Sequence, residues 1–190
     1  MWQPTIAVYD TNVLYPAPLR DLLIRLAQAG LVQAKWTEMI HDEWTRNLLS
    51  NHSGITPEQV SRTRDLMNLA IRDSLVTGHE PLIETLQLPD PDDRHVLAAA
   101  IKAGAQCIVT FNLKDFPAEY LARYGVIATH PDHFLMQLIE QMPNAVCNAL
   151  KLQRAGLKNP PQTASQLLQT LFNQGLEQSI TRLRNHADQI

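Results

Sequence analysis

The chain has 190 residues, 45% of them hydrophobic and 18% charged, which is the composition of a folded protein with a sizeable core and excludes a disordered chain. A formal net charge of −3 gives no overall basic signature of a nucleic-acid-binding protein. The two cysteines are too few for a disulfide framework, and the absence of a long apolar run excludes a membrane span. The first residues carry neither a basic region nor a long apolar run, so we expect no signal peptide and a cytoplasmic location.

In the first half of the chain, short apolar runs alternate with amphipathic stretches. We expect buried strands at 6–9 and 32–36, and helices at 19–29, 38–49 and 56 to about 75. The last of these helices has a strong start, because Thr56 can cap it, Pro57 fits its first position and Gln59 can complete a capping box. Residues 78–88 fit either a strand or an ordered loop.

The next part of the chain continues this alternation. A polar turn at 89–93 leads into an apolar helix at 96–103, which Gly104 ends. We expect a buried strand at 106–110, with Cys107 in the core, a turn or short helix at 112–116, and a further strand at 125–129. Strands that alternate with helices predict an α/β/α sandwich with a central, mainly parallel sheet.

From Pro131 onward the pattern is helical. We expect helices at 131–142, 144–155 and 163–186, which are separated by Pro143 and by the proline-containing stretch 156–162. We therefore predict a domain at 1–135 and a helical C-terminal extension at 136–190. The apolar side chains between Leu167 and Ile180 are typical of a buried helix face, with a docking surface for a partner helix as the alternative.

Acidic side chains follow the predicted strands at points where they can meet. Asp10 ends the first strand, Asp115 follows the strand that ends at Thr110, and Glu43 lies on the helix after the second strand. A cluster of Asp90, Asp92 and Asp93 opens a helix. Ligands of open α/β sheets bind at the carboxyl ends of the strands, and gathered carboxylates repel one another unless a hard cation separates them. Oxygen ligands favour Mg²⁺ or Mn²⁺, and without paired His or Cys ligands we do not expect zinc.

Each acid also has an ordinary structural explanation when it is taken alone. Asp10 is a typical turn residue, and Asp92 or Asp93 is a typical helix N-cap. Glu43 and Asp115 are compatible with solvated surface positions. The functional hypothesis therefore depends on the joint order of these residues.

Four segments together resemble the PIN-domain family, in particular its VapC-like toxins. They are the strand and Asp-Thr-Asn at 6–14, Glu43 in the following helix, the acid-led helix at 90–100, and the strand followed by Thr-Phe-Asn-Leu-Lys-Asp-Phe at 108–117. The resemblance covers roughly residues 4–135. It implies the PIN fold and a Mg²⁺- or Mn²⁺-dependent endoribonuclease. For VapC-like members it also implies an antitoxin partner and a homodimer.

The resemblance assigns roles to individual positions. The metal-binding, catalytic acids become Asp10, Glu43, Asp93 and Asp115. Asp93 is preferred over Asp92 because it stands three residues before Val96, but Asp92 stays open. The supporting residues are Asn12 and Thr110, which would orient carboxylates, and Asn112, which would act in an outer shell or bind water.

Several other residue types near these motifs carry less information. The histidines at 41, 95 and 130 are not spaced as ligands, and we expect no catalytic histidine. Trp36 and Trp44 are expected in the core, with stacking on bases as the alternative. The basic residues at 46, 94 and 114 are expected on the surface, with RNA phosphates as the alternative partners.

Two other functions remain as rivals to a ribonuclease toxin of the VapBC type. One is a PIN-fold interaction module without catalysis that acts through its C-terminal helices. The other is a phosphatase of the haloacid-dehalogenase type, which needs a second Asp two residues after the first. Asn12 occupies that position and disfavours the phosphatase.

Overall fold

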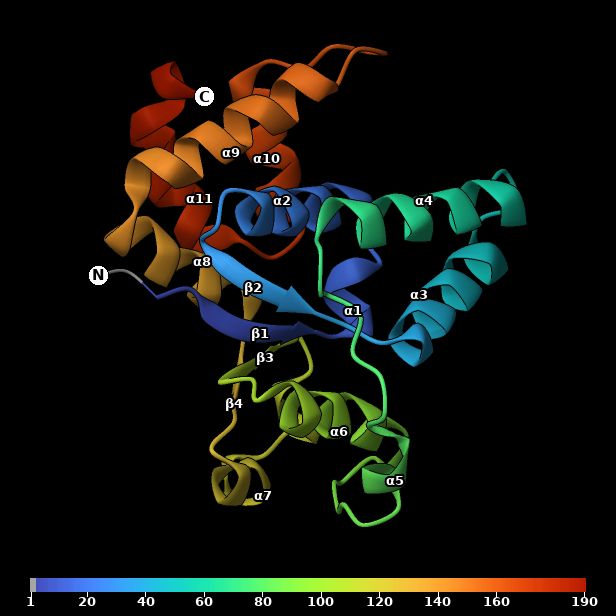
Figure 1. The fold of residues 1–190 in the computed structure, drawn as a ribbon. Coiled ribbons are helices and arrows are strands. Elements are labelled where there is room, and N and C mark those ends of the chain that lie inside the picture. The colour runs from blue at the N-terminus through green and yellow to red at the C-terminus, as the bar shows by residue number, and fades with distance from the viewer. Residues whose placement is uncertain (1–2) are drawn as a thin grey trace.

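The computed structural model describes residues 3–190 and contains a four-stranded sheet between two layers of helices (Figure 1). The strands are β1 (Thr5–Tyr9), β2 (Val32–Lys35), β3 (Cys107–Val109) and β4 (Ile127–Thr129). Their order in the sheet is β2-β1-β3-β4, and every pairing is parallel. The predicted α/β/α sandwich is confirmed. Residues 1 and 2, with which the predicted 1–135 domain begins, lie outside the described residues.

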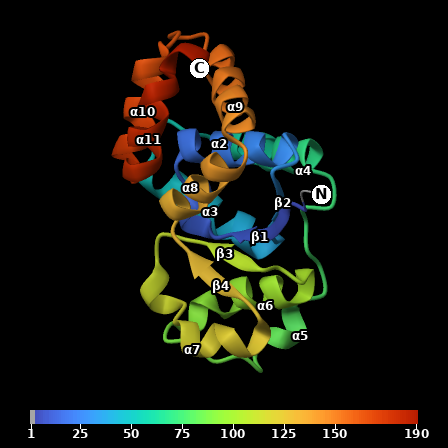
Figure 2. The same ribbon diagram turned by 90° about the vertical axis from the view of Figure 1, so that its left-hand side faces the viewer.

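Helices cover both faces of the sheet (Figures 1 and 2). On one face lie α1 (Thr11–Leu14), α2 (Ala17–Gln28), α3 (Glu38–Asn51), α4 (Pro57–Ala70) and the helices that follow β4. On the other face lie α5 (Glu80–Ile83), α6 (Arg94–Ala103) and α7 (Ala118–Leu121). We use the term C-terminal helices for α8 (Pro131–Gln141), α9 (Pro143–Gly156), α10 (Ala164–Asn173) and α11 (Glu177–Leu183). The sheet is thus covered on both sides, as a parallel sheet of apolar strands requires.

Local sequence signals account for several of these elements. In β1, Ala7, Val8 and Tyr9 have no exposed surface, which explains why the strand reads as a continuous apolar run. The predicted capping box of α4 is present, because Thr56 and Gln59 each bond the backbone N–H of the other. The short helices α1 and α7 are not predictable from the sequence, since four residues are too few to show a period.

The end predicted for α4 is wrong: the helix stops at Ala70 and not near Leu75. Asp73 has a φ of 59°, which turns the chain back toward the sheet. There the N–H of Trp36 donates to the Ser74 carbonyl over 2.9 Å, and the N–H of Val76 donates to the Trp36 carbonyl over 2.8 Å. Backbone pairing with the end of β2 therefore replaces the last turn of the predicted helix. The uncertain stretch 78–88 contains the single turn α5 and no strand.

The single helix predicted at 163–186 is also wrong. It is divided into α10 and α11 by a turn at Gly175, whose φ of 93° only glycine adopts without strain. A 3₁₀ segment, Arg184–Gln189, follows. Most of the apolar side chains from Leu167 to Ile180 nevertheless lie inside the protein, with Leu167, Leu168, Leu171, Leu176 and Ile180 all at most 1% exposed. These five form core, as the first interpretation expects, and are not available to a partner helix, whereas Phe172 is partly buried.

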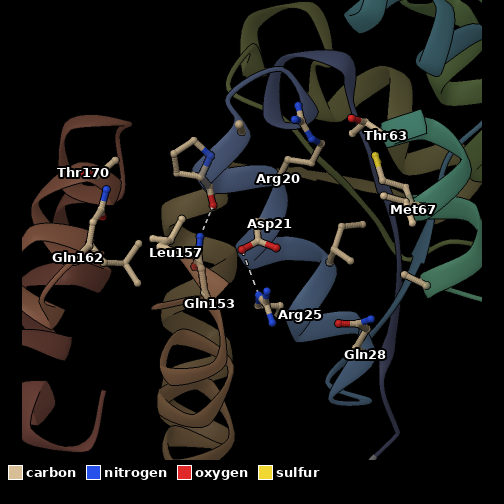
Figure 3. Close-up of a pocket in the computed structure, with 16 residues that line it drawn as sticks. Arg20, Asp21, Arg25, Gln28, Thr63, Met67, Gln153, Leu157, Gln162 and Thr170 are labelled. Carbon is tan, nitrogen blue, oxygen red and sulfur yellow. Dashed lines mark hydrogen bonds and ion pairs between the residues drawn. The ribbon is translucent and has the colours of Figure 1, made fainter. Parts of the chain in front are cut away.

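The C-terminal helices pack directly on the sheet and on α2. The ring of Phe134 in α8 meets Tyr9 of β1 edge-on, with centroids 6.5 Å apart. Gln153 in α9 is 1% exposed and donates to the carbonyl of Pro18 over 2.8 Å, as the dashed line in Figure 3 marks. The domain boundary near residue 135 stays a prediction. No helix of residues 3–190 has the length and apolar character of a membrane span.

One buried carboxylate joins α8 to α11. Asp132 is 6% exposed, and its two carboxylate oxygens accept hydrogen bonds from the N–H groups of Gln178 (2.9 Å) and Ser179 (2.8 Å). The hydroxyl of Ser179 returns a 2.7 Å bond to the Asp132 carbonyl. The first turn of α11 is thus capped by a side chain 46 residues earlier.

Replacing this carboxylate should weaken the C-terminal helices. We expect Asp132→Ala to lower the free energy of unfolding by about 1–3 kcal/mol, because two buried N–H donors lose their acceptor. Urea unfolding followed by circular dichroism measures the change. Asp65→Ala, which removes an exposed carboxylate from α4, is the matched control. Equal effects of the two substitutions would contradict this role of Asp132.

Candidate metal centre

Asp10 lies at the carboxyl end of β1, beside the end of β3. Its side chain is 3% exposed and surrounded by donors. Oδ1 accepts from the N–H of Thr11 at 2.7 Å, and thereby caps α1. Oδ2 accepts from the hydroxyl of Thr110 and from the amide of Asn12, each at 2.7 Å. Asn12 and Thr110 therefore lie where the sequence predicts them, in contact with this carboxylate.

Glu43 comes from α3 and reaches the same region. Its Oε2 accepts from the hydroxyl of Thr11 at 2.9 Å and lies 3.2 Å from Nε2 of His95. The hydrogen bond from His95 is the main reason that the pKa of Glu43 is lowered, so this acid is held in its charged form.

Sequence reasoning alone misses the contact of His95. His95 is 6% exposed and lies two residues after Asp93, in the first turn of α6. Its only signal in the sequence is a histidine on an otherwise apolar helix face. The ring of His95 meets Glu43 because the tertiary fold brings the start of α6 close to α3, and no local sequence pattern shows this.

Three further acids meet at the start of α6 and after β3. One carboxylate oxygen from each of Asp90, Asp93 and Asp115 lies within 4.8 Å of the others. The sequence places Asp90 in the acidic cluster but does not select it as a site residue. It also caps the 3₁₀ turn Pro91–Asp93, because its Oδ1 accepts from the N–H of Asp92 at 2.9 Å.

The capping role considered for Asp92 or Asp93 holds only in position: Asp93 is the N-cap residue of α6, but its side chain makes no capping hydrogen bond. Asp92 lies inside the preceding 3₁₀ turn, which Asp90 caps. Asp92 is exposed, whereas Oδ2 of Asp93 is buried and has no hydrogen-bond partner among the described residues. Burying a carboxylate oxygen without a hydrogen-bond donor lowers the stability of the fold unless another group binds to that oxygen.

Asp115 is positioned by the loop after β3. The amide of Asn112 donates to its Oδ2, and the backbone N–H of Asn112 donates to the Thr110 hydroxyl at 3.0 Å. Because Thr110 also bonds Asp10, one short segment connects two of the four predicted acids. Asn112 thus contacts a carboxylate, as expected of a residue in an outer shell.

The acids of the cluster differ in how far their pKa values are shifted. Burial is the largest cause that raises the pKa of Asp93, followed by the charges of Asp10, Asp90, Asp115 and Glu43, and together they bring it to about 7. Burial also raises the pKa of Asp10, although its bonds from Thr110 and Thr11 act in the opposite direction. Without a cation the cluster holds more negative charge than its surroundings neutralise.

Asp10, Glu43, Asp90 and Asp93 line a pocket of about 450 Å³ with further polar residues, namely Thr11, Asn12, Tyr15, Asn47, Asn51, Asp92 and Asn112. An all-oxygen donor set and the unpartnered Asp93 oxygen fit a hard divalent cation such as Mg²⁺ or Mn²⁺. A larger cavity of about 620 Å³ lies between α2, α4, α9 and α10, where Figure 3 shows Asp21 paired with Arg25. None of the acids of the centre lines that cavity.

The remaining candidates have mostly structural positions. Trp36 and Trp44 have no exposed surface, which confirms their place in the core and excludes stacking on bases. His41 accepts from the indole N–H of Trp44 at 3.0 Å, and His130 accepts from the N–H of Asp132 at the start of α8. The basic residues at 46 and 114 are exposed, whereas Arg94 donates to the Pro91 carbonyl.

Comparison with known proteins adds independent findings. A family model described as PIN domain matches residues 7–114, and one described as VapC50 C-terminal domain matches residues 131–185. A Mycobacterium tuberculosis protein named "Putative ribonuclease VapC50" is 40% identical over 82 residues. The match covers 43% of this chain and 48% of that protein, so the chain spans about half the length of the curated relative it matches. No solved structure matches the chain.

The raised pKa of Asp93 predicts a pH dependence of stability in the absence of divalent cations. The folded state binds this proton more tightly than the unfolded state, with pKa values of about 7 and 3.8. The contribution is therefore fully present below about pH 4 and is lost as the pH rises through 7. We expect Asp93→Asn in EDTA to be more stable than the wild type at pH 8 by on the order of 1 kcal/mol, allowing for solvent screening of a half-buried group.

Thermal unfolding at pH 5 and pH 8 measures this effect. The gain corresponds to a melting temperature roughly 2–4 °C higher at pH 8 and should shrink toward pH 5. Titrating groups far from Asp93 cancel in the comparison with the wild type at each pH. Asp92→Asn, next in the chain and exposed, should show little change. A gain for Asp93→Asn that is equal at both pH values would rule out the raised pKa as its cause.

Proposed function

Because the chain belongs to the PIN-domain family, whose model matches more than half of its length, we propose that it is a metal-dependent endoribonuclease. One observation carries the proposal. Asp10, Glu43 and Asp93 line one pocket at the carboxyl edge of the sheet, a carboxylate oxygen of Asp115 lies within 4.8 Å of one of Asp93, and Asp93 has a buried oxygen without a donor. A protein that used this fold only for binding would have no need of so much uncompensated negative charge.

The four acids are the proposed ligands of one or two Mg²⁺ or Mn²⁺ ions, with Asp90 as a fifth candidate. The chemistry supplied by such a cation is Lewis acidity toward a phosphodiester and a water molecule. Asp10 keeps its place through three donors, and its Oδ1, which accepts from Thr11 alone, retains a free lone pair for a ligand bond. Of the proposed ligands, Asp93 would be stabilised most by a bound cation, since its Oδ2 has no other partner among the described residues.

The supporting residues fix the ligands before a cation binds. Thr110 and Asn12 prevent rotation of the Asp10 carboxylate, while His95 and Thr11 hold Glu43 at Oε2. Such outer contacts lower the cost of ordering a site. Asn47 and Asn51 on α3 line the open side of the pocket and are suited to contact an RNA backbone. The exposed Arg46 and Lys114 are candidates for phosphate contacts.

Cleavage of RNA tests the proposal directly. We expect Mg²⁺- or Mn²⁺-dependent cleavage of RNA by the full chain, abolished by EDTA. Single substitutions of the ligands, including Asp10→Asn and Asp93→Asn, should lower the rate at least about 100-fold, since even outer partners of ligands cost 10–100-fold.

Two matched variants make this test specific. Asp92→Asn alters an exposed neighbour of Asp93 and should cost far less than Asp93→Asn. Asp65→Asn on α4 should leave the rate unchanged. Cleavage that persists in EDTA and in Asp10→Asn would refute the proposal. Folded protein that binds Mn²⁺ but cleaves no RNA would favour the rival, a non-catalytic PIN module.

We further propose that the protein is the toxin of a VapBC-type pair and acts on cytoplasmic RNA. The name of the matched relative and the match to a VapC50 C-terminal domain support this finer assignment. The expected partner is a cognate antitoxin protein, and a homodimer is the expected assembly.

Growth of a bacterial host tests the toxin assignment. Induced expression of the wild type should arrest growth, because RNA cleavage stops protein synthesis, whereas Asp10→Asn should not arrest it. Co-expression of a small protein encoded beside the gene should restore growth. Equal inhibition by the wild type and by Asp10→Asn would mean that toxicity does not come from the acidic site.

A further inference from the structure

The loop after β3 holds part of the acidic site and is itself held from two sides. Toward the site, the N–H of Phe111 donates to Oδ1 of Asn12 at 3.0 Å, while Thr110 and Asn112 bond Asp10 and Asp115. The backbone of residues 110–112 therefore sets the positions of two carboxylates. A shift of this loop would disturb both of them.

The side chain of Phe111 leaves the site and contacts the C-terminal helices. Its ring meets that of His130, the residue that caps α8, edge-on with centroids 5.1 Å apart. It also lies against Gly175, in the turn between α10 and α11. A Cβ atom at Gly175 would lie only 3.1 Å from Cε1 of Phe111. Two features thus require a glycine at position 175: the backbone φ of 93° and the closeness of the Phe111 ring.

The turn that carries Gly175 is fixed within the C-terminal helices. Asp132 accepts from the N–H groups of Gln178 and Ser179, three and four residues after Gly175. Leu176, next to the glycine, has no exposed surface. The contact at Phe111 is therefore made by a well-anchored turn and not by a loose loop end.

We propose that the C-terminal helices act as a positioning element for the acidic site. The turn at Gly175 supports the ring of Phe111, which holds the loop at 110–115 and with it the carboxylates of Asp10 and Asp115. Phe111 is a positioning residue and touches neither cation nor RNA. The inference rests on the proposed function insofar as those carboxylates bind a cation.

A double-mutant cycle with two readouts tests the inference on the full chain. The variants are Phe111→Ala, Gly175→Ala and the pair. The readouts are Mn²⁺ affinity by calorimetry and amide hydrogen exchange at residues 111 and 112. Gly30→Ala is the control, because Gly30 has a φ of 73° but a Cβ atom there would meet no other atom within 4 Å. It therefore reproduces the backbone strain without the contact. Phe111→Leu retains an apolar side chain and serves as the conservative variant.

We expect each single substitution to weaken Mn²⁺ binding roughly tenfold, as for outer partners of metal ligands. The double variant should also lose about tenfold in Mn²⁺ affinity and not a hundredfold, because both substitutions remove the same contact. Exchange at 111 and 112 should accelerate in all three variants, and Phe111→Leu should recover most of both effects. Gly30→Ala should match the wild type at these amides.

Three results would overturn the inference: unchanged exchange at 111 and 112, losses that multiply in the pair, or an equal effect of Gly30→Ala. Exchange is measured without a cation, so it separates this inference from the proposed function. Accelerated exchange in a protein whose wild type binds no Mn²⁺ would support the positioning contact and refute the metal site. If Gly175→Ala does not fold, the comparison of Phe111→Ala with Phe111→Leu still tests the inference, by Mn²⁺ affinity and by amide exchange.

Discussion

The hydroxyl of Thr110 donates to the carboxylate of Asp10 over 2.7 Å and joins the carboxyl-terminal ends of the two central strands. Tyr9 and Val109 are partners in the parallel register, so the residues that follow them emerge side by side. Thr110 also accepts from the side chain of Asn12 and the N–H of Asn112, and it has no exposed surface. One buried hydroxyl therefore orders both strand ends, and the acidic centre is assembled around it.

The parts of the fold that follow from local signals were predictable. Apolar runs indicated the four strands, and the Thr56 capping box indicated the start of α4. The two failures have different causes. The end of α4 is determined by pairing of residues 74–76 with Trp36, a partner that no local sequence window contains. The break at Gly175 has a local signal, the glycine itself, but the helical spacing of the leucines before and after it favoured one continuous helix.

The same distinction applies to the site. Asp10, Asp93 and Asp115 each stand beside a recognisable strand end or helix start, and this was sufficient to predict that they lie near one another. His95 was missed because its significance depends on facing Glu43, which lies 52 positions away on another helix. Asp90 was passed over because one side chain does two things: it caps a turn and faces the other carboxylates. Roles that depend on where a side chain points require the tertiary structure.

The acids differ in how completely the protein satisfies them, and this difference has a physical consequence. Asp10 and Glu43 receive donors from Thr11, Thr110 and His95, so the fold itself stabilises their positions. Asp93 receives none at its buried oxygen, and burial together with the neighbouring acidic charges raises its pKa to about 7. Electrostatic strain is thus concentrated on one carboxyl group, while the groups around it are held rigid. In the proposed function, a divalent cation supplies the partner that this oxygen lacks without a rearrangement of the chain, because no group within the described residues donates to that oxygen.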